Sequence, residues 1–196
     1  MKEKKLIGLT GKYCAGKNFI SSLLEKRGFP VLDVDVLGHQ VMEKEREAII
    51  EHFGNDILDA NGKINRKLLG KKVFGKPEEL SLLESIIHPA ANRETIAWID
   101  ERKDTCIINA ALLHRSSVFD KLDGIIIVKA PLLCRILRAK KRDKLPWIAI
   151  FKRINSQKNF YPQYFSRKTD IQTIENSVFH RKVEDRLDKI ISLLGI

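Results

Sequence analysis

The sequence of 196 residues predicts an α/β fold in three layers, with helices flanking a five-stranded parallel sheet. The first observation behind this prediction is the alternation of short apolar runs with helical patterns along the chain. The second is that the runs LIGL and GIIIV are continuously apolar, which is typical of strands covered on both faces. The expected strands are KLIGLT (5–10), PVLDVD (30–35), TCIINA (105–110), GIIIVKA (124–130) and DIQTIE (170–175).

Two amphipathic helices are expected to pack on this sheet. Gly28 followed by Pro30 predicts the end of a helix between the first two strands. The apolar face of that helix consists of Phe19, Ile20, Leu23 and Leu24. A helix at the end of the chain carries an apolar stripe made by Val183, Leu187, Ile190, Ile191 and Leu194. Stripes of this kind predict helices with one buried side.

Two segments interrupt the alternation and are interpreted as additions to a single domain. Residues 36–104 show helical patterns around a polar turn at 59–63, which predicts a helical insertion. Residues 135–168 hold eleven Lys or Arg and one acid, Asp143. This segment is too long for a plain connection, so we expect a mobile basic lid. The core is then formed by residues 1–35, 105–134 and 169–196.

The composition favours a compact protein with anionic partners. Hydrophobic residues make up 43% and charged residues 31%, and the formal net charge is +11. Cys14, Cys106 and Cys134 lack the spacing of a zinc site or a redox pair, which indicates a reducing setting. The sequence contains no signal-peptide pattern and no apolar run long enough to span a membrane. We therefore expect a cytoplasmic protein with no membrane partner.

The stretch GLTGKYCAGKN at residues 8–18 carries the first chemical signal. Gly11, four variable residues and Gly16-Lys17 match a phosphate-binding loop, here between a strand and a helix. Its backbone amides and the helix N-terminus would hold phosphates, and Lys17 would reach the β and γ phosphates of ATP. The pattern predicts a P-loop NTPase fold; the alternative is an ordinary glycine turn. The expected nucleotide-binding residues here are Gly11, Lys12, Tyr13, Cys14, Ala15, Gly16, Lys17, Asn18 and Phe19.

Asn18 stands where a Ser or Thr hydroxyl usually binds Mg²⁺. An amide oxygen can bind a hard cation, but more weakly than a well-placed hydroxyl. Because phosphate oxygens and water supply most Mg²⁺ ligands in such sites, we expect a weakened but functional magnesium site.

Asp33 and Asp35 end the second expected strand, where a period of two puts them on one face. Ligands of open α/β sheets bind beyond the carboxyl ends of the strands, so this edge also carries the phosphate loop. Asp33 could accept the proton of an attacking hydroxyl or hold Mg²⁺. Asp35 has two alternative roles on the sequence, a contact with the substrate or the N-cap of a helix.

The chain resembles the dephospho-CoA kinase family over nearly its whole length. Beyond the loop, the matching stretches keep the family order. They are LDVDVLGHQV (32–41), DANGKINRKLLGKKVF (59–74), LLESIIHPAANRE (82–94), ALLHR (111–115), RAKKRD (138–143) with Gln157 downstream, and TDIQTIEN (169–176).

The resemblance implies transfer of the γ-phosphate of ATP to the ribose 3′-hydroxyl of dephospho-CoA, with Mg²⁺ held by Asn18 and Asp33. It implies that Asp33 is the catalytic base, assisted by Lys17 and Arg142. Arg138 and Arg142 would be lid arginines, and Asn176 would lie near the adenine. The resemblance assigns dephospho-CoA binding to Asp33, Asp35, Arg66, His88 and Arg93. It implies no nucleic-acid partner and no obligate protein partner.

Several of these residues have plainer alternatives. His88 precedes a proline and could mark a helix start or a satisfied core histidine. Arg66 and Arg93 could be ordinary surface charges. Lys12 stands where the family usually has a glycine. Because a lysine tolerates positive φ poorly, the replacement requires negative φ at this position. Cys14 is either a thiol with a lowered pKa near a helix N-terminus or a tolerated small residue. Further departures from the family pattern are Asn65, Ala111 and Arg115.

Two other functions stay open on the sequence. One is a kinase of the same fold with another small-metabolite or nucleoside-monophosphate acceptor. The other is nucleic-acid binding, because aromatic residues are interleaved with the bases of 135–168. These aromatic residues are Trp147, Phe151, Phe160, Tyr161, Tyr164 and Phe165.

Overall fold

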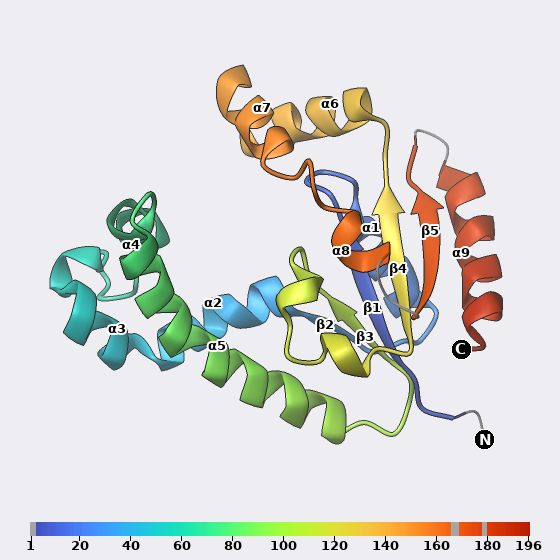
Figure 1. Cartoon of the computed structure of the whole chain (residues 1–196), viewed down its shortest axis with the longest axis horizontal. Coiled ribbons are helices and arrows are strands. Elements are labelled where there is room, and N and C mark those ends of the chain that lie inside the picture. Colours follow the sequence, from blue (N-terminus) through green and yellow to red (C-terminus); the bar gives the residue numbers. More distant parts are fainter. Residues whose placement is uncertain (1–2, 166–168, 178–179) are drawn as a thin grey trace. The chain divides into compact units, whose positions relative to one another are not determined.

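The computed structural model describes residues 3–165, 169–177 and 180–196 of the chain. Two compact units are present (Figure 1). The sheet unit is formed by Met1–Asp33 and Glu101–Ile196, and the helical unit by Val34–Asp100.

The sheet unit is built on five parallel strands in the order β2-β3-β1-β4-β5, as Figure 1 shows. This confirms the predicted fold class and all five expected strands. Their bounds are β1 Leu6–Gly11, β2 Val31–Asp33, β3 Cys106–Asn109, β4 Gly124–Lys129 and β5 Asp170–Glu175. The strand expected at 30–35 is shorter than predicted, because helix α2 begins at Val34.

Helices α1 (Lys17–Lys26) and α9 (His180–Leu194) pack on one face of the sheet. The predicted apolar face of α1 is confirmed, because Ile20, Leu23 and Leu24 are buried and Phe19 is partly buried. Burying each such aliphatic side chain contributes roughly 1.5–3 kcal/mol relative to exposure. The predicted stripe of α9 also packs into this core, with Ile191 partly buried.

The opposite face of the sheet is covered by shorter elements. These are the 3₁₀ turns η2 (Leu113–Arg115) and η3 (Phe119–Lys121) and the short helix α8 (Pro162–Phe165). At Gly8 of β1 an added Cβ would lie 2.5 Å from a methyl of Leu113, so the turn packs directly on the strand backbone. Tyr164 of α8 is fully buried and its hydroxyl lies 3.2 Å from Nδ1 of His114.

Two further helices of the sheet unit, α6 (Leu132–Asp143) and α7 (Trp147–Asn155), form a hairpin that follows β4. They occupy most of the predicted lid at 135–168, and α6 begins three residues before its expected start. Residues 166–168 of that expected segment lie outside the described residues.

The helical unit has a hydrophobic core of its own, in which Ile49, Ile57 and Leu69 are among the most buried residues. Its helices are α2 (Val34–Lys44), α3 (Arg46–Phe53), α4 (Arg66–Val73) and α5 (Pro77–Asp100), with the 3₁₀ turn η1 (Asn55–Ile57). Asn65 caps α4, because its side chain accepts hydrogen bonds from the amides of Lys67 and Leu68. An Asn can therefore replace an acid at this position without losing the cap.

Within the described residues, no helix combines the length and the apolar character that crossing a membrane requires.

Candidate active site

The loop from Gly11 to Lys17 turns from β1 into α1, and two of its glycines are required by geometry. Gly16 has φ of +96°, and a Cβ there would lie 1.9 Å from Nδ2 of Asn176. A Cβ on Gly11 would lie 2.7 Å from the carbonyl oxygen of Val128 on the neighbouring strand. Because only glycine avoids both contacts, the backbone can make the tight turn that a phosphate loop needs.

The carbonyl of Ala15 in this loop is held by two predicted site residues. Nδ2 of Asn176 donates to it at 3.0 Å, and Nη1 of Arg138 donates at 3.2 Å. Arg138 also donates to the carbonyl oxygen of Asn176 at 3.1 Å. The structure thus brings Arg138 and Asn176 together at the loop, although they are distant in sequence.

Tyr13 connects the loop to the α6–α7 hairpin and to the residues that follow it. Its amide donates to Oε1 of Gln157 at 2.6 Å, and Nε of Arg135 donates to its carbonyl at 2.8 Å. Its hydroxyl donates to the carboxylate of Asp143. Sequence reasoning gave none of Arg135, Asp143 and Gln157 a role in the site. For Asp143 a signal existed, because it is the one acid among the bases of 135–168.

Arg142 is positioned by the same carboxylate. Its Nε donates to Oδ1 of Asp143 at 2.6 Å, and Nη1 of Arg153 donates to Oδ2 at 3.1 Å. The guanidinium carbon of Arg142 also lies 5.3 Å from the ring centroid of Tyr13. Chiefly because of the hydrogen bond from Arg142, the pKa of Asp143 falls to about 2. Asp143 in turn raises the pKa of Arg142, so both stay charged at neutral pH.

Asp33 ends β2 at the same sheet edge as the loop. In the sheet register Asp33 is opposite Asn109, and Asn109 is opposite Leu9 of β1. The carboxylate is therefore two strand spacings from β1, or roughly 10 Å. Nδ2 of Asn109 donates to Oδ2 of Asp33 at 3.1 Å. Asn109 is buried at the end of β3, and the sequence analysis did not identify it.

Asp35 does not share a strand face with Asp33. It lies in the first turn of α2, because the strand ends at Asp33. The period-two argument for Asp33 and Asp35 was therefore wrong, while a place at the start of a helix agrees with the capping alternative.

The remaining predicted substrate residues lie in the helical unit. Nη1 of Arg66, the first residue of α4, is 2.8 Å from a ring nitrogen of His39. Arg93 on α5 is exposed and its Nη2 lies 3.6 Å from the carboxylate of Glu45. His88 is exposed in the interior of α5, which continues through Pro89. Neither plain alternative for His88, a helix start or a core histidine, is correct.

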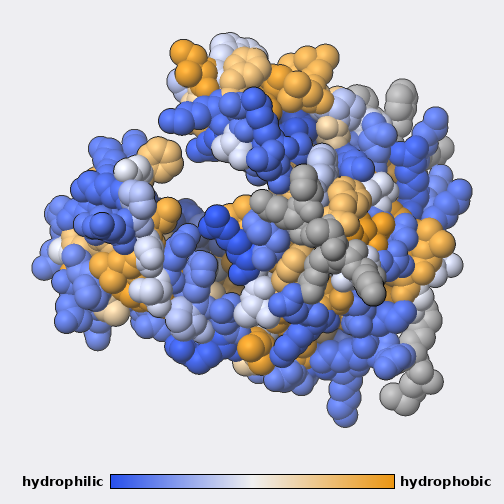
Figure 2. Space-filling model, viewed as in Figure 1, coloured by the Kyte–Doolittle hydropathy of each residue, from blue (hydrophilic) through white to orange (hydrophobic). Residues whose placement is uncertain are grey.

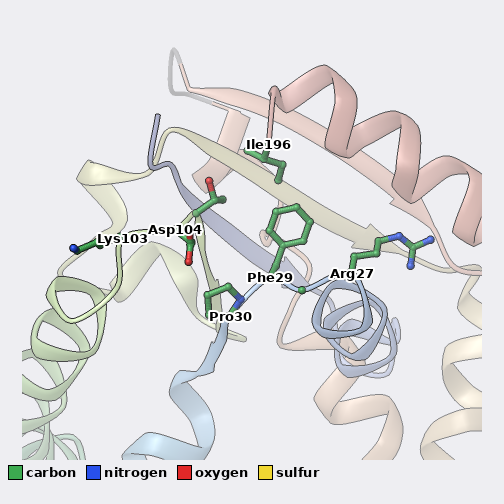
Figure 3. A pocket seen from close by; sticks show the side chains of 8 residues that line it. Arg27, Phe29, Pro30, Lys103, Asp104 and Ile196 are labelled. Carbon is green, nitrogen blue, oxygen red and sulfur yellow. The ribbon is translucent and has the colours of Figure 1, made fainter. Parts of the chain in front are cut away.

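A surface pocket of about 460 Å³ lies elsewhere, before the amino ends of β2 and β3. Figure 3 shows its lining side chains, among them Arg27, Phe29, Lys103 and Ile196. Arg27 donates to Asp188 at 2.6 Å. Because ligands of open α/β sheets bind at the carboxyl ends of the strands, this pocket is not the catalytic site.

A family model described as dephospho-CoA kinase matches residues 5–178. The chain belongs to the dephospho-CoA kinase family. It is 33% identical to the dephospho-CoA kinase of Treponema denticola over 89% of this chain and 83% of that protein. It is 34% identical to the dephospho-CoA kinase of Fusobacterium nucleatum, with 94% of each chain covered. These findings confirm the resemblance stated from the sequence.

Solved structures agree with the fold. A crystal structure of a Thermus thermophilus protein matches with a TM-score of 0.78 and 27% identity, covering 98% of this chain and 99% of that one. A dephospho-CoA kinase from Campylobacter jejuni matches with a TM-score of 0.67 and 22% identity over 97% of each chain. A shikimate kinase from Bacteroides thetaiotaomicron shares the fold, with a TM-score of 0.54 and 15% identity, covering 98% of this chain and 99% of that one.

The loop geometry explains Lys12, a departure from the dephospho-CoA kinase pattern, and corrects one expectation for Cys14. Lys12 is not among the described residues with positive φ, and its Nζ lies 4.3 Å from the ring centroid of Tyr161. Burial and the charge of Arg135 lower the pKa of Lys12. Cys14 has φ of +59° and is half-buried, and burial raises the pKa of its thiol. The idea of a lowered Cys14 pKa was therefore wrong.

The start of α1 places the remaining loop residues. Lys17 and Phe19 are half-buried, and Phe19 packs on the core of the sheet unit. Asn18 is exposed in the first turn of α1. Its amide is therefore accessible to a ligand at the loop.

The available donors fit a magnesium ion in chemical type. Asp33 and Asn18 offer hard oxygen ligands, which Mg²⁺ prefers. Oδ1 of Asn109 is buried and has no hydrogen-bond partner within the described residues. This acceptor beside Asp33 suits a cation or a cation-bound water.

The aromatic residues of 135–168 are divided between core and surface. Phe160 and Tyr164 are buried, and Tyr161 is half-buried. Trp147, Phe151 and Phe165 are exposed. The aromatic set therefore does not form one continuous stacking surface for nucleic-acid bases.

Proposed function

We propose that this member of the dephospho-CoA kinase family transfers the γ-phosphate of ATP to the ribose 3′-hydroxyl of dephospho-CoA, giving coenzyme A and ADP. The observation that carries the proposal is the placement of the phosphate loop and Asp33 at one edge of the sheet. Phosphoryl transfer requires mainly positioning and charge neutralisation, and this edge supplies both.

In this proposal the amides from Gly11 to Phe19 and the N-terminus of α1 bind the phosphates of ATP, and Lys17 contacts the β and γ phosphates. The hydrogen bonds of Asn176 and Arg138 to Ala15 keep the loop in its binding shape before ATP arrives. Such preorganisation reduces the ordering cost of binding.

Asp33 acts as the general base for the attacking hydroxyl. The bond from Asn109 to Oδ2 orients the carboxylate, which accepts the proton of the hydroxyl. Asp33, Asn18 and Oδ1 of Asn109 are the residues that would hold Mg²⁺, which supplies charge neutralisation at the phosphate oxygens.

Residues 135–168 act as the lid in this proposal. Arg142 stabilises the transferring phosphate, and Asp143 and Tyr13 set its starting position. The insertion at about 36–104 binds dephospho-CoA through Asp35, Arg66, His88 and Arg93. Residues 1–35, 105–134 and 169–196 form the catalytic core, and both substrates are small molecules that we expect the protein to meet in the cytoplasm.

The deciding experiment measures ADP formation by the purified chain with ATP and Mg²⁺, with and without dephospho-CoA. We expect ADP release to depend on dephospho-CoA and mass spectrometry to identify coenzyme A. Lys17→Ala is the control for contaminating ATPase activity. A panel of nucleoside monophosphates and other small alcohols tests the alternative acceptors. A higher kcat/KM with any of them would contradict the proposed acceptor.

A further inference from the structure

The α6–α7 hairpin exposes large apolar side chains on one side. They are Leu133 and Leu137 of α6 and Trp147, Ile148 and Phe151 of α7, each at least 48% exposed. Ile148 is 84% exposed. Figure 2 shows the corresponding hydrophobic area above these helices, at the top of the view. We call these five residues the outer face of the hairpin.

Helical spacing makes this face continuous on each helix. Leu133 and Leu137 are four residues apart, and Trp147 and Phe151 are also four apart with Ile148 between them, so each set lies on one side of its helix. The two helices pack against each other, and Nζ of Lys140 on α6 lies 5.0 Å from the ring centroid of Trp147.

The hairpin does not need these side chains for its own packing. Ala139 and Ile150 are fully buried, and Arg135 is buried against the carbonyl of Tyr13. A soluble protein rarely exposes a contiguous apolar patch without a partner. The outer face therefore has the character of a docking surface.

Positive charge borders the outer face. Lys141 follows Leu137 by four residues and Lys152 follows Ile148 by four, so each lysine lies at the edge of an apolar stripe. From 132 to 158 the chain has nine Lys or Arg and one acid, although Arg135 and Arg138 contact the phosphate loop and not the outer face. That acid, Asp143, is already paired with Arg142 and Arg153. The hairpin is thus cationic around an apolar centre.

We propose that the outer face docks on an anionic lipid surface. Trp147, Ile148 and Phe151 enter the interface between headgroups and acyl chains, and Lys141 and Lys152 contact lipid phosphates. Apolar side chains bordered by lysines are the composition of helices that lie in the membrane plane. The expectation of no membrane partner rested on the lack of a spanning segment, and docking of this kind needs none.

Charge and side-chain type argue against other occupants. A second copy of the chain would bring two cationic borders together, and like charges disfavour that contact. Nucleic acid would suit the lysines and could stack on Trp147 and Phe151, but three of the five side chains are aliphatic, including Ile148, which is the most exposed. An aliphatic majority favours lipid over stacked bases.

The test is sedimentation of the full chain with vesicles of phosphatidylcholine containing about 30% phosphatidylglycerol, against phosphatidylcholine alone. We expect binding to the anionic vesicles that weakens steeply as salt is raised from about 0.1 M to about 1 M. The double variant Ile148→Ser/Phe151→Ser should bind at least about tenfold more weakly. The affinity of Lys141→Gln/Lys152→Gln for anionic vesicles should be lower by about tenfold or more, since each lysine raises the affinity for an anionic surface about fivefold.

The matched control is Leu193→Ser on α9, because Leu193 and Leu133 are both 67% exposed. It should leave vesicle binding unchanged. The residues altered in the two double variants and in this control are exposed, so thermal unfolding should be unchanged in these three variants. Quenching of tryptophan emission by brominated lipid gives a second measurement, which should disappear in Trp147→Phe and persist in Trp98→Phe.

Four results would overturn the proposal. One is no binding to anionic vesicles at about 0.1 M salt, and another is unchanged binding by Ile148→Ser/Phe151→Ser. The third is a wild-type protein that does not bind vesicles but forms a dimer, when the same double variant is monomeric. That result would assign the outer face to a second copy. Oligonucleotide binding that survives this double variant while vesicles are not bound would overturn it in the same way.

Discussion

The phosphate loop and the proposed acceptor-binding residues of the helical unit are positioned by different kinds of contact. Buried or half-buried groups hold the loop, and Asn176 is 3% exposed where it donates to Ala15. Arg66, His88 and Arg93 are instead exposed, and the ion pair of Arg93 with Glu45 is at the surface. Exposed pairs contribute little to stability, whereas losing a buried hydrogen-bond partner is costly. In the proposed function the nucleotide side is therefore preorganised, while we expect the acceptor side to order its long side chains upon binding.

Gly16→Ala should have the largest effect on stability, because it disrupts the hydrogen bond that supports the phosphate loop. The new Cβ would displace Asn176 from Ala15 and place alanine at φ of +96°. We expect the free energy of unfolding to fall by about 2–5 kcal/mol, from left-handed strain and a lost buried hydrogen bond. Chemical denaturation measures it, and ATP binding should weaken as well.

Gly28→Ala is the matched control, because Gly28 has φ of +86° but, apart from its chain neighbours, no described residue has an atom within 4 Å of an added Cβ. It should cost only the strain, about 1–2 kcal/mol. Equal losses for the two variants would mean that the contact with Asn176 does not stabilise the loop.

Asp33→Asn should reduce kcat by at least about a hundredfold, the usual scale for a lost general base. ATP should still bind, since the loop is untouched. Steady-state kinetics and calorimetry measure the two quantities. Asp35→Asn, two residues on in α2, should change KM for dephospho-CoA more than kcat. Near-normal kcat in Asp33→Asn would remove Asp33 from the mechanism.

Arg66→Ala tests the acceptor side. We expect KM for dephospho-CoA to rise about tenfold, or about 1.4 kcal/mol, with KM for ATP unchanged. Lys67→Ala, the next residue and also exposed, should change neither constant. A rise in KM for ATP would show that the nucleotide and acceptor sides are not separable as described.

Asn18→Ser restores a hydroxyl at the first turn of α1. We expect the half-saturating Mg²⁺ concentration to fall a few-fold, because a well-placed hydroxyl binds the ion better than an amide. A titration of activity against Mg²⁺ measures the change. Lower activity at saturating Mg²⁺ would indicate instead that Asn18 is adapted to its neighbours.

The smallest effect is expected from acid, through Asp143. Its folded-state pKa of about 2 lies below the unfolded value of about 3.9, so its stabilising contribution is complete above pH 4 and is lost as pH falls toward 2. Wild type should therefore have the higher Tm at pH 5, and its advantage over Asp143→Asn should shrink toward pH 2. Thermal melts across this range measure the difference, which should not depend on pH above 5.

Much of the fold could be predicted because the information is local. The stripes of α1 and α9, the continuous apolarity of β1 and β4, and the glycines of the loop are all visible within short windows of sequence. A helix period or a positive φ is a demand that neighbouring residues reveal directly. The length of β2 was the exception, because DVD fits a strand end and a helix start equally well and the helix began at Val34.

The sequence by itself determined where the strands lie along the chain, where the phosphate loop lies, and that Asp33 follows the second strand's apolar run. Only the tertiary structure decided which further side chains support the loop, because Gln157 and Arg135 reach Tyr13 from 144 and 122 residues away. The bond from Asn109 to Asp33 likewise exists because β3 lies between β2 and β1 in the sheet. Contacts of this kind depend on how strands are ordered in space, and no local pattern encodes that order.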